Sequence, residues 1–120
     1  MKKFFSNLYR KIATVLAFSM LATVAHAGAY NCNAALSGVG VYSDGKVFIH
    51  QGYAWVYVCN MTTQGSFTMS TDACKAAYST FVLARATGAA VDIYYNNAAT
   101  CATLSAWTAY NDVYAVDGPN

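Results

Sequence analysis

Residues 70–95 read STDACKAAYSTFVLARATGAAVDIYY, and the fold class depends on this segment because its pattern changes from helix to strand. The Ser-Thr-Asp start offers a helix cap, and Asp72 places a negative charge in the first turn, where it stabilises the helix dipole. Alanines recur at helical spacing through Ala73–Thr87, and Gly88 is a natural C-terminal stop. Ala90–Tyr95 then alternates, as a strand does. The segment therefore predicts one helix that leads directly into a strand.

Three strands are predicted before this helix. Ser37–Tyr42 alternates, the Asp44-Gly45 dipeptide suits a tight hairpin turn, and Lys46–His50 alternates again. Tyr53–Asn60 is the longest strand candidate. Both of its faces carry apolar or aromatic side chains, which indicates a strand that is central or covered on two sides.

The chain after the helix predicts two or more strands. Ala90–Tyr95 is followed by a turn at Asn96-Asn97 and by a strand at Asn111–Val116. A mostly β, five-stranded barrel with one helix between its third and fourth strands, in the order β-β-β-α-β-β, is typical of the OB-fold. Other small α+β domains share this order. We expect Phe81 and Leu83 of the helix to plug an open end of the barrel.

The N-terminus has the three parts of a secretory signal peptide. A basic leader precedes the uncharged, mostly apolar run Ile12–Val24, and Ala25-His26-Ala27 places small residues where a signal peptidase cleaves. The apolar run is shorter than the roughly 20 residues of a membrane-spanning helix. We therefore expect a signal peptide at 1–27 and one secreted or periplasmic domain at 28–120; an uncleaved anchor is the alternative.

The charge left after cleavage argues against nucleic acid and anionic lipid as partners. The whole chain has a formal net charge of +2, but four of its seven basic residues lie in the leader. The mature domain keeps three cations and all five acidic residues, which are aspartates. Three scattered cations cannot form the basic stripe that neutralises several phosphates. Aromatic faces, hydroxyls and amides are the expected means of binding.

The four cysteines are Cys32, Cys59, Cys74 and Cys101, and all follow the predicted cleavage site. An even number in a short exported domain predicts two disulfides, each worth roughly 2–4 kcal/mol. A zinc site is the alternative, but no pair has C-x-x-C spacing and the mature chain has a single histidine. The residues alone leave all three pairings open. No metal or cofactor is expected.

Few side chains of the mature chain could perform acid–base catalysis. It has no glutamate and one histidine, His50, while Asp44 suits a turn and Asp72 a helix start. A general acid–base site needs two groups with different pKa values within reach of the substrate, and no spacing nominates such a pair. We expect His50 to be solvated or locally hydrogen-bonded and the protein not to be an enzyme. A hydrolase that uses His50 is the alternative.

Aromatic residues are the conspicuous excess. Nine tyrosines and two tryptophans follow the leader. Their rings combine a flat apolar face with a polar tip, which suits sugar stacking and protein interfaces. The candidates for such contacts are Trp55, Tyr57, Tyr94, Tyr95, Trp107 and Tyr110. The alternative is that alternate members fill the core or a subunit interface, and this alternative is favoured for the two on the long strand.

Several short motifs also suggest a family. Ser37–Val41 reads SGVGV, while Tyr78–Phe81, Thr87-Gly88 and Val91–Tyr95 read YSTF, TG and VDIYY. These segments resemble the opening strand, the helix with its Thr-Gly stop and the Ile-Tyr-Tyr strand of the B subunits of subtilase cytotoxin and the pertussis-like typhoid toxin. Small exported proteins of unassigned function share the helix–Gly–strand–Cys pattern.

The resemblance implies an OB-fold that assembles as a homopentamer, binds glycans that are often sialylated, and can have an enzymatic A-type partner. It implies that Ser37 and Tyr95 contribute to the sugar pocket. Asn33 stands where the toxins commonly have an acidic residue, which is a departure from their pattern. The exported relatives imply a Cys59–Cys101 disulfide, which leaves Cys32 to pair with Cys74.

These observations predict a secreted, non-enzymatic binding module with an OB-fold-like domain that recognises glycans on a cell surface. The alternative is a structural or protein-interaction factor of the envelope without lectin activity.

Overall fold

The structure is a computed structural model, and it describes residues 30–96 and 100–119. The predicted signal peptide at 1–27 lies outside the described residues, as does Asn97 of the predicted turn. Among the described residues, no helix combines the length and the apolar character that crossing a bilayer requires.

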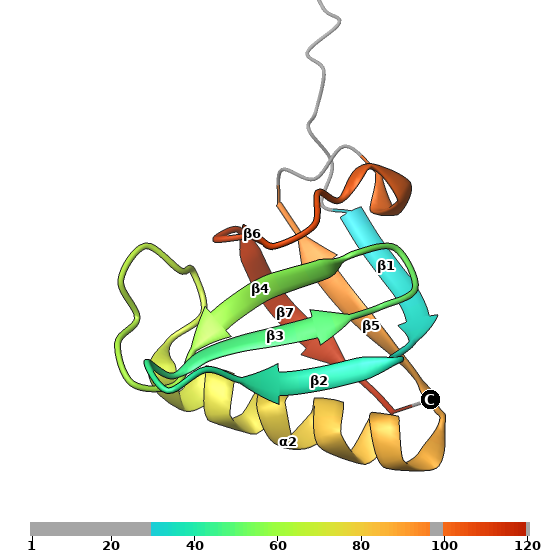
Figure 1. Cartoon of the computed structure of the whole chain (residues 1–120), viewed down its shortest axis with the longest axis horizontal. Coiled ribbons are helices and arrows are strands. Elements are labelled where there is room, and N and C mark those ends of the chain that lie inside the picture. Colours follow the sequence, from blue (N-terminus) through green and yellow to red (C-terminus); the bar gives the residue numbers. More distant parts are fainter. Residues whose placement is uncertain (1–29, 97–99, 120) are drawn as a thin grey trace, which may run out of the picture.

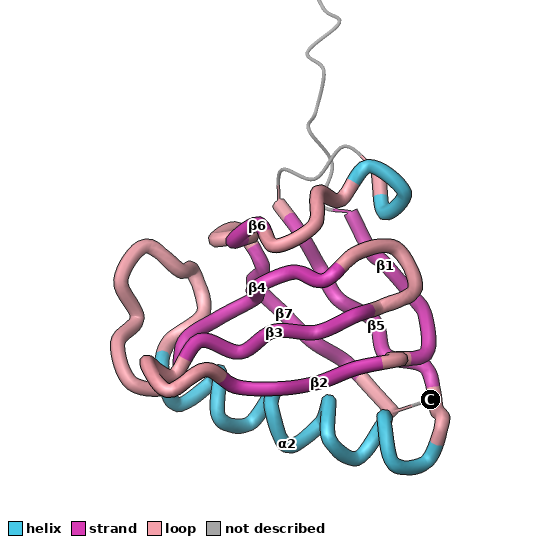
Figure 2. The backbone as a smooth tube through the Cα atoms, in the orientation of Figure 1, coloured by secondary structure: helices cyan, strands magenta, loops and turns pink. Residues whose placement is uncertain are grey.

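The described chain is mostly β with one α-helix, α2, which follows four strands and precedes three (Figure 1). The elements are β1 (Tyr30–Ala35), β2 (Gly38–Val41), β3 (Lys46–His50), β4 (Trp55–Asn60), α2 (Thr71–Thr87), β5 (Ala90–Tyr95), the 3₁₀ turn η1 (Cys101–Thr103), β6 (Thr108–Ala109) and β7 (Val113–Asp117). Figure 2 shows the loop between β4 and α2 as a long excursion at one end of the sheet.

The strands form two sheets that share one core. β2, β3 and β4 make an antiparallel meander, and β6 adds in parallel to β4. β5 lies between β1 and β7, antiparallel to both. Figure 1 shows the four-stranded sheet in front of the three-stranded one, with α2 below both. α2 packs against β2, β3 and β4 of one sheet and β5 of the other.

This arrangement corrects the predicted strand order. Four strands precede the helix where three were predicted, and the strands lie in two sheets that are not closed into a single barrel. Tyr30–Ala35 was missed because its side chains are small or polar and only Cys32 among them is buried, so it has no apolar alternation. β2 covers only Gly38–Val41 of the predicted first strand. The chain bends at Ser37, whose backbone N–H still donates to the His50 carbonyl at 2.9 Å, and Tyr42 leads into the hairpin turn.

The predicted alternation on the other strands is confirmed. Val47 and Ile49 of β3 are buried, as are Val56 and Val58 of β4, while Ile93 stands on the buried face of β5. Burying such side chains stabilises the fold by roughly 1.5–3 kcal/mol each.

The predicted helix is confirmed at both ends. Ser70 accepts a hydrogen bond on its side chain from the backbone N–H of Ala73 at 3.2 Å, which satisfies one of the unpaired donors of the first turn. Gly88 ends the helix with a φ of 73°, a left-handed conformation that glycine adopts without steric cost. Phe81 is fully buried, as expected. The same prediction for Leu83 was wrong: its side chain is 52% exposed because it points away from the sheets.

Two disulfides join distant parts of the fold, but their pairing corrects the one that the resemblance implied. Cys32 of β1 bonds Cys101 of η1, with the Cα atoms 5.6 Å apart. Cys59 of β4 bonds Cys74 in the first turn of α2, with the Cα atoms 5.7 Å apart. The implied pairing was wrong because Cys59 on β4 lies beside the first turn of α2, whereas Cys101 in η1 lies beside β1. Disulfides of this kind are typical of oxidising, extracellular environments.

Candidate functional site

Six aromatic side chains cover the outer side of the four-stranded sheet, and we call this surface the aromatic face. Its members are Tyr42, Phe48, His50, Trp55, Tyr57 and Trp107. Period-two alternation places four of them there, since the intervening side chains of β3 and β4 are buried valines and isoleucine. The sheet thus has a dry inner side and an aromatic outer side.

The rings are in continuous contact. Along one row, the centroids of His50 and Trp55 are 5.1 Å apart, those of Trp55 and Phe48 are 5.7 Å apart, and those of Phe48 and Tyr42 are 5.0 Å apart. Tyr57 lies beside this row, 5.7 Å from Tyr42. These separations are those of favourable tilted aromatic pairs. The face is therefore one surface and not a set of isolated rings.

Two glycines of β2 make room for these rings. A Cβ atom on Gly38 would lie 2.1 Å from Cη2 of Trp55, and one on Gly40 would lie 2.2 Å from Cζ of Phe48. Both distances are far below van der Waals contact. Because these glycines have no side chain, the rings of Trp55 and Phe48 can lie directly on the backbone of β2.

Trp107 completes the face at β6. Its indole stacks on that of Trp55 with an interplanar angle of 3° and a centroid distance of 5.6 Å, and it is 51% exposed. Its backbone N–H donates to the carbonyl of Trp55 at 2.6 Å. Its φ is 57°, a left-handed conformation that is rare for a bulky residue and costs on the order of 1–3 kcal/mol. The fold thus holds a large, half-exposed ring on a strained backbone.

Hydroxyl and imidazole groups mark one end of the aromatic face. Ser37 forms a hydrogen bond between its Oγ and Nδ1 of His50, and its Oγ also lies 3.3 Å from the His50 carbonyl oxygen. The prediction of a locally hydrogen-bonded His50 is therefore confirmed. The imidazole in turn packs on Trp55.

Polar groups also mark the opposite end, beyond the Val41–Val47 pair of the β2–β3 hairpin. The hydrogen bond with the Tyr42 hydroxyl is the main cause of a raised pKa for the Tyr57 phenol, with burial second. Beside them, Lys46 Nζ lies 2.9 Å from Asp44 Oδ2, and hydrogen bonds from Lys46 lower the pKa of that carboxyl. The face is thus apolar in its middle and polar at both ends.

The structure does not bring the three glycan residues of the toxin resemblance together. Ser37 lies at the edge of the aromatic face. Asn33 lies on the other sheet, where its Nδ2 donates to Asp92 Oδ1 at 3.0 Å. Tyr95 is fully buried, and burial raises the pKa of its phenol well above the usual range. Its hydroxyl has no hydrogen-bond partner among the described residues.

The aromatic candidates of the sequence fall into two groups. Trp55, Tyr57 and Trp107 belong to the aromatic face. Tyr94 pairs instead with Tyr114 on the three-stranded sheet, at a centroid distance of 5.9 Å. Tyr110 contacts the buried Tyr95 edge-on, and its hydroxyl accepts a hydrogen bond from the backbone N–H of Ser105.

Sequence reasoning missed Tyr42 and Phe48 as site residues. The signal for Phe48 was present, because it alternates with Val47 and Ile49 and so belongs to the side opposite the core. Tyr42 had the same signal, because it ends the alternating run Ser37–Tyr42 on the side opposite Val39 and Val41. No group of three or more histidine, cysteine, aspartate or glutamate side chains within residues 30–96 and 100–119 is placed to hold a metal ion.

Comparison of the chain with family models, with curated proteins and with solved structures finds no match.

Proposed function

We propose that this protein is an exported, non-enzymatic module that binds glycans on its aromatic face. The single observation that carries the proposal is the continuity of six partly or largely exposed rings with hydrogen-bonding groups at both ends. Sugar rings present C–H faces that stack on aromatic rings, and their hydroxyls need donors and acceptors at the rim. An aromatic surface whose two charged side chains form an ion pair with each other suits such a neutral ligand.

The strained backbone of Trp107 supports the proposal. A solvent-exposed indole on a left-handed backbone costs free energy, and its exposed half adds nothing to the core. Strain of this kind is concentrated at binding sites, where the side chain's position matters more than stability. Trp107 is therefore the first residue to substitute.

An OB-like architecture is part of the proposal. Only Leu36 and Ser37 separate β1 from β2, and only residues 110–112 separate β6 from β7. If each pair is counted as one bent strand, five strands form the circuit 1-2-3-5-4-1, with α2 between the third and the fourth. The aromatic face then covers the second and third strands, the surface that OB-folds use for oligosaccharides and oligonucleotides. The toxin-like features of a homopentamer, an A-type partner and a cell-surface target are extensions of this proposal.

A glycan array tests the proposed function directly. We expect the oxidised mature protein to retain a subset of neutral glycans and Trp107→Ala to lose at least about tenfold in affinity, equivalent to 1.4 kcal/mol. Tyr114→Ala is the matched control, because Tyr114 is 41% exposed but pairs with Tyr94 on the other sheet. Retention of no glycan by protein with both disulfides intact would remove the proposal.

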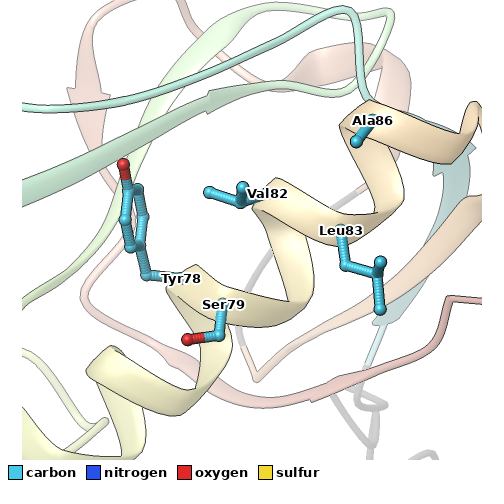
Figure 3. A pocket seen from close by; sticks show the side chains of 5 residues that line it. All are labelled: Tyr78, Ser79, Val82, Leu83 and Ala86. Atoms are coloured by element: carbon cyan, nitrogen blue, oxygen red, sulfur yellow. The ribbon is translucent and has the colours of Figure 1, made fainter.

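A second candidate function, protein–protein interaction, has an observation of its own. Val82 and Leu83 of α2 are 45% and 52% exposed. With Tyr78, Ser79 and Ala86 they line an open hollow of about 400 Å³ on the helix (Figure 3). Figure 3 shows all five side chains coming from this one helix. Such apolar surface suits contact with another copy of the chain or with an envelope protein.

Light scattering separates this candidate from the first. If α2 is an interface between copies, the wild-type protein is oligomeric and Leu83→Asp is monomeric, while glycan retention of the monomer is unchanged. A monomeric wild-type protein that co-purifies with an envelope protein, and that loses this partner on Leu83→Asp, would instead support a hetero-interaction.

A further inference from the structure

We propose that the aromatic face binds a linear, uncharged oligosaccharide along its whole length, with the Ser37–His50 pair contacting one end and the Tyr42–Tyr57 pair the other. This inference rests on the proposed function and goes further, because it sets the length and the charge of the ligand. It also departs from the sialylated sugars that the toxin resemblance implies.

The extent of the ring surface sets the length. The row from His50 through Trp55 and Phe48 to Tyr42 has three successive centroid separations of 5.0 to 5.7 Å, and Trp107 and Tyr57 lie beside it. One pyranose ring has about the size of one aromatic side chain, so a single sugar would leave most of the row uncovered. A chain of several sugars would cover it.

The two polar ends are too far apart for one sugar to contact both. Gly38 pairs with His50 at one end of the β2–β3 hairpin, and Val41 pairs with Val47 at the other. Three residues of strand separate these pairs, which is about 10 Å at the usual rise per residue. Hydroxyls on one sugar cannot bridge this span, whereas the terminal units of a short chain can.

The charge distribution excludes a strong preference for an anionic chain. Lys46 and Asp44 are the charged side chains at the aromatic face among the described residues, and they form an ion pair with each other at 2.9 Å. The other cations that the structure describes, Lys75 and Arg85, lie on α2. An acidic sugar would therefore lose the water around its charged group without meeting an unpaired positive charge. A neutral chain has no charge to desolvate.

Tryptophan fluorescence and calorimetry with defined saccharides test the inference. The probes are the monomer, dimer, trimer and tetramer of β-1,4-linked N-acetylglucosamine and of β-1,4-linked glucose, with sialyllactose as the anionic comparison. Both tryptophans of the chain lie in the aromatic face, so their emission reports binding there. We expect at least about tenfold tighter binding of the trimer than of the monomer in one series, little further gain for the tetramer, and weaker binding of sialyllactose than of the neutral trimer.

Hydroxyl deletions at the two ends locate the chain. Tyr42→Phe and Ser37→Ala are each expected to weaken trimer binding about three- to tenfold, while the monomer responds to one of them at most. Tyr114→Phe on the other sheet is the matched control and is expected to change nothing.

The outcomes separate this inference from the proposed function. Equal affinity for monomer and tetramer, or a trimer affinity that is unchanged in both Tyr42→Phe and Ser37→Ala, would overturn the inference and leave glycan binding in place. A preference for sialyllactose over the neutral trimer would overturn its charge argument. No fluorescence or heat response to any of these saccharides would overturn the inference, and together with no retention on the glycan array it would overturn both.

Discussion

The bare backbone at Gly38 and Gly40 fixes where the rings of the aromatic face lie. At Gly40, an added Cβ would meet three atoms of the Phe48 ring within 2.9 Å, and the substitution would push this ring out of its row. The sequence motif SGVGV thus has a physical meaning beyond strand formation. Each glycine sits under one aromatic ring, and Val39 between them packs against the core.

Gly40→Ala is therefore expected to destabilise the protein by about 1–3 kcal/mol, as overpacking does, and to change the near-ultraviolet circular dichroism of the aromatic residues. Val39→Ala is the control, because it loses stability through a smaller core side chain while the rings remain in place. Urea denaturation and the near-ultraviolet spectrum measure the two effects. An unchanged spectrum in Gly40→Ala would show that the missing side chain at Gly40 does not determine the position of the Phe48 ring.

Tyr95 allows a prediction about alkaline pH. Its buried hydroxyl has no hydrogen-bond partner among the described residues, so Tyr95→Phe should be neutral or stabilising by about 1 kcal/mol. Burial raises the pKa of its phenol above the ordinary 10.0, so the folded protein keeps the proton that the unfolded chain loses. The free energy of unfolding is therefore unaffected by this ionisation below about pH 10 and falls as the pH rises from there toward the raised pKa.

Urea denaturation at neutral pH and above about pH 10 checks this prediction. We expect the stability of Tyr95→Phe to fall less steeply at high pH than that of the wild type. Tyr110→Phe is the matched control, because the Tyr110 hydroxyl accepts a hydrogen bond from Ser105 and its loss is destabilising at neutral pH. A marked loss of stability in Tyr95→Phe at neutral pH would mean that its hydroxyl has a partner.

At the scale of elements, α2 shows how local signals determine a helix. Ser70→Ala removes the side-chain acceptor for the Ala73 N–H and is expected to cost about 1 kcal/mol. Ser79→Ala is the control, since Ser79 lies in the middle of the helix on its exposed side and its Oγ donates to the carbonyl of Lys75. In thermal unfolding, we expect the melting temperature of Ser70→Ala to be clearly lower than that of Ser79→Ala. Equal melting temperatures would contradict a stabilising cap.

The elements differ in how far the sequence predicts them, and the reason is the range of the interactions that form them. α2, β3, β4 and β5 have their own caps, turns or alternation, so local patterns suffice. β6 has only two residues and exists because Trp107 and Tyr110 donate to carbonyls of β4, far away in the sequence. β1 is formed by pairing with β5 and has little apolar pattern of its own.

The residues of the candidate site also differ in how far the sequence predicts their positions. Trp55, Tyr57 and Trp107 were candidates from residue type alone, but the contacts of Trp55 and Trp107 with Phe48 depend on how β3, β4 and β6 pair. Tyr95 was expected at a sugar pocket because of a motif, whereas the alternation of its own strand placed it in the core. A motif gives a residue's type and spacing, but not the side of the sheet that it occupies.

The two disulfides allow a prediction for the whole molecule. Cys32 and Cys101 are 69 residues apart, while Cys59 and Cys74 are 15 residues apart. Closing the longer loop restricts the unfolded chain more, so we expect Cys32→Ala with Cys101→Ala to cost about 1 kcal/mol more than the roughly 3 kcal/mol expected for Cys59→Ala with Cys74→Ala. Urea denaturation compares the two double variants. A larger loss for the shorter loop would mean that the packing of its fully buried sulfurs outweighs chain entropy.

The Cys32–Cys101 bond also has a consequence for when this protein can work. Cys101 begins the segment that carries Trp107, so the bond anchors one half of the stacked indole pair to β1. A newly made, reduced chain would lack this anchor for the segment that carries Trp107. Under the proposed function, sugar binding would therefore begin only after this disulfide has formed.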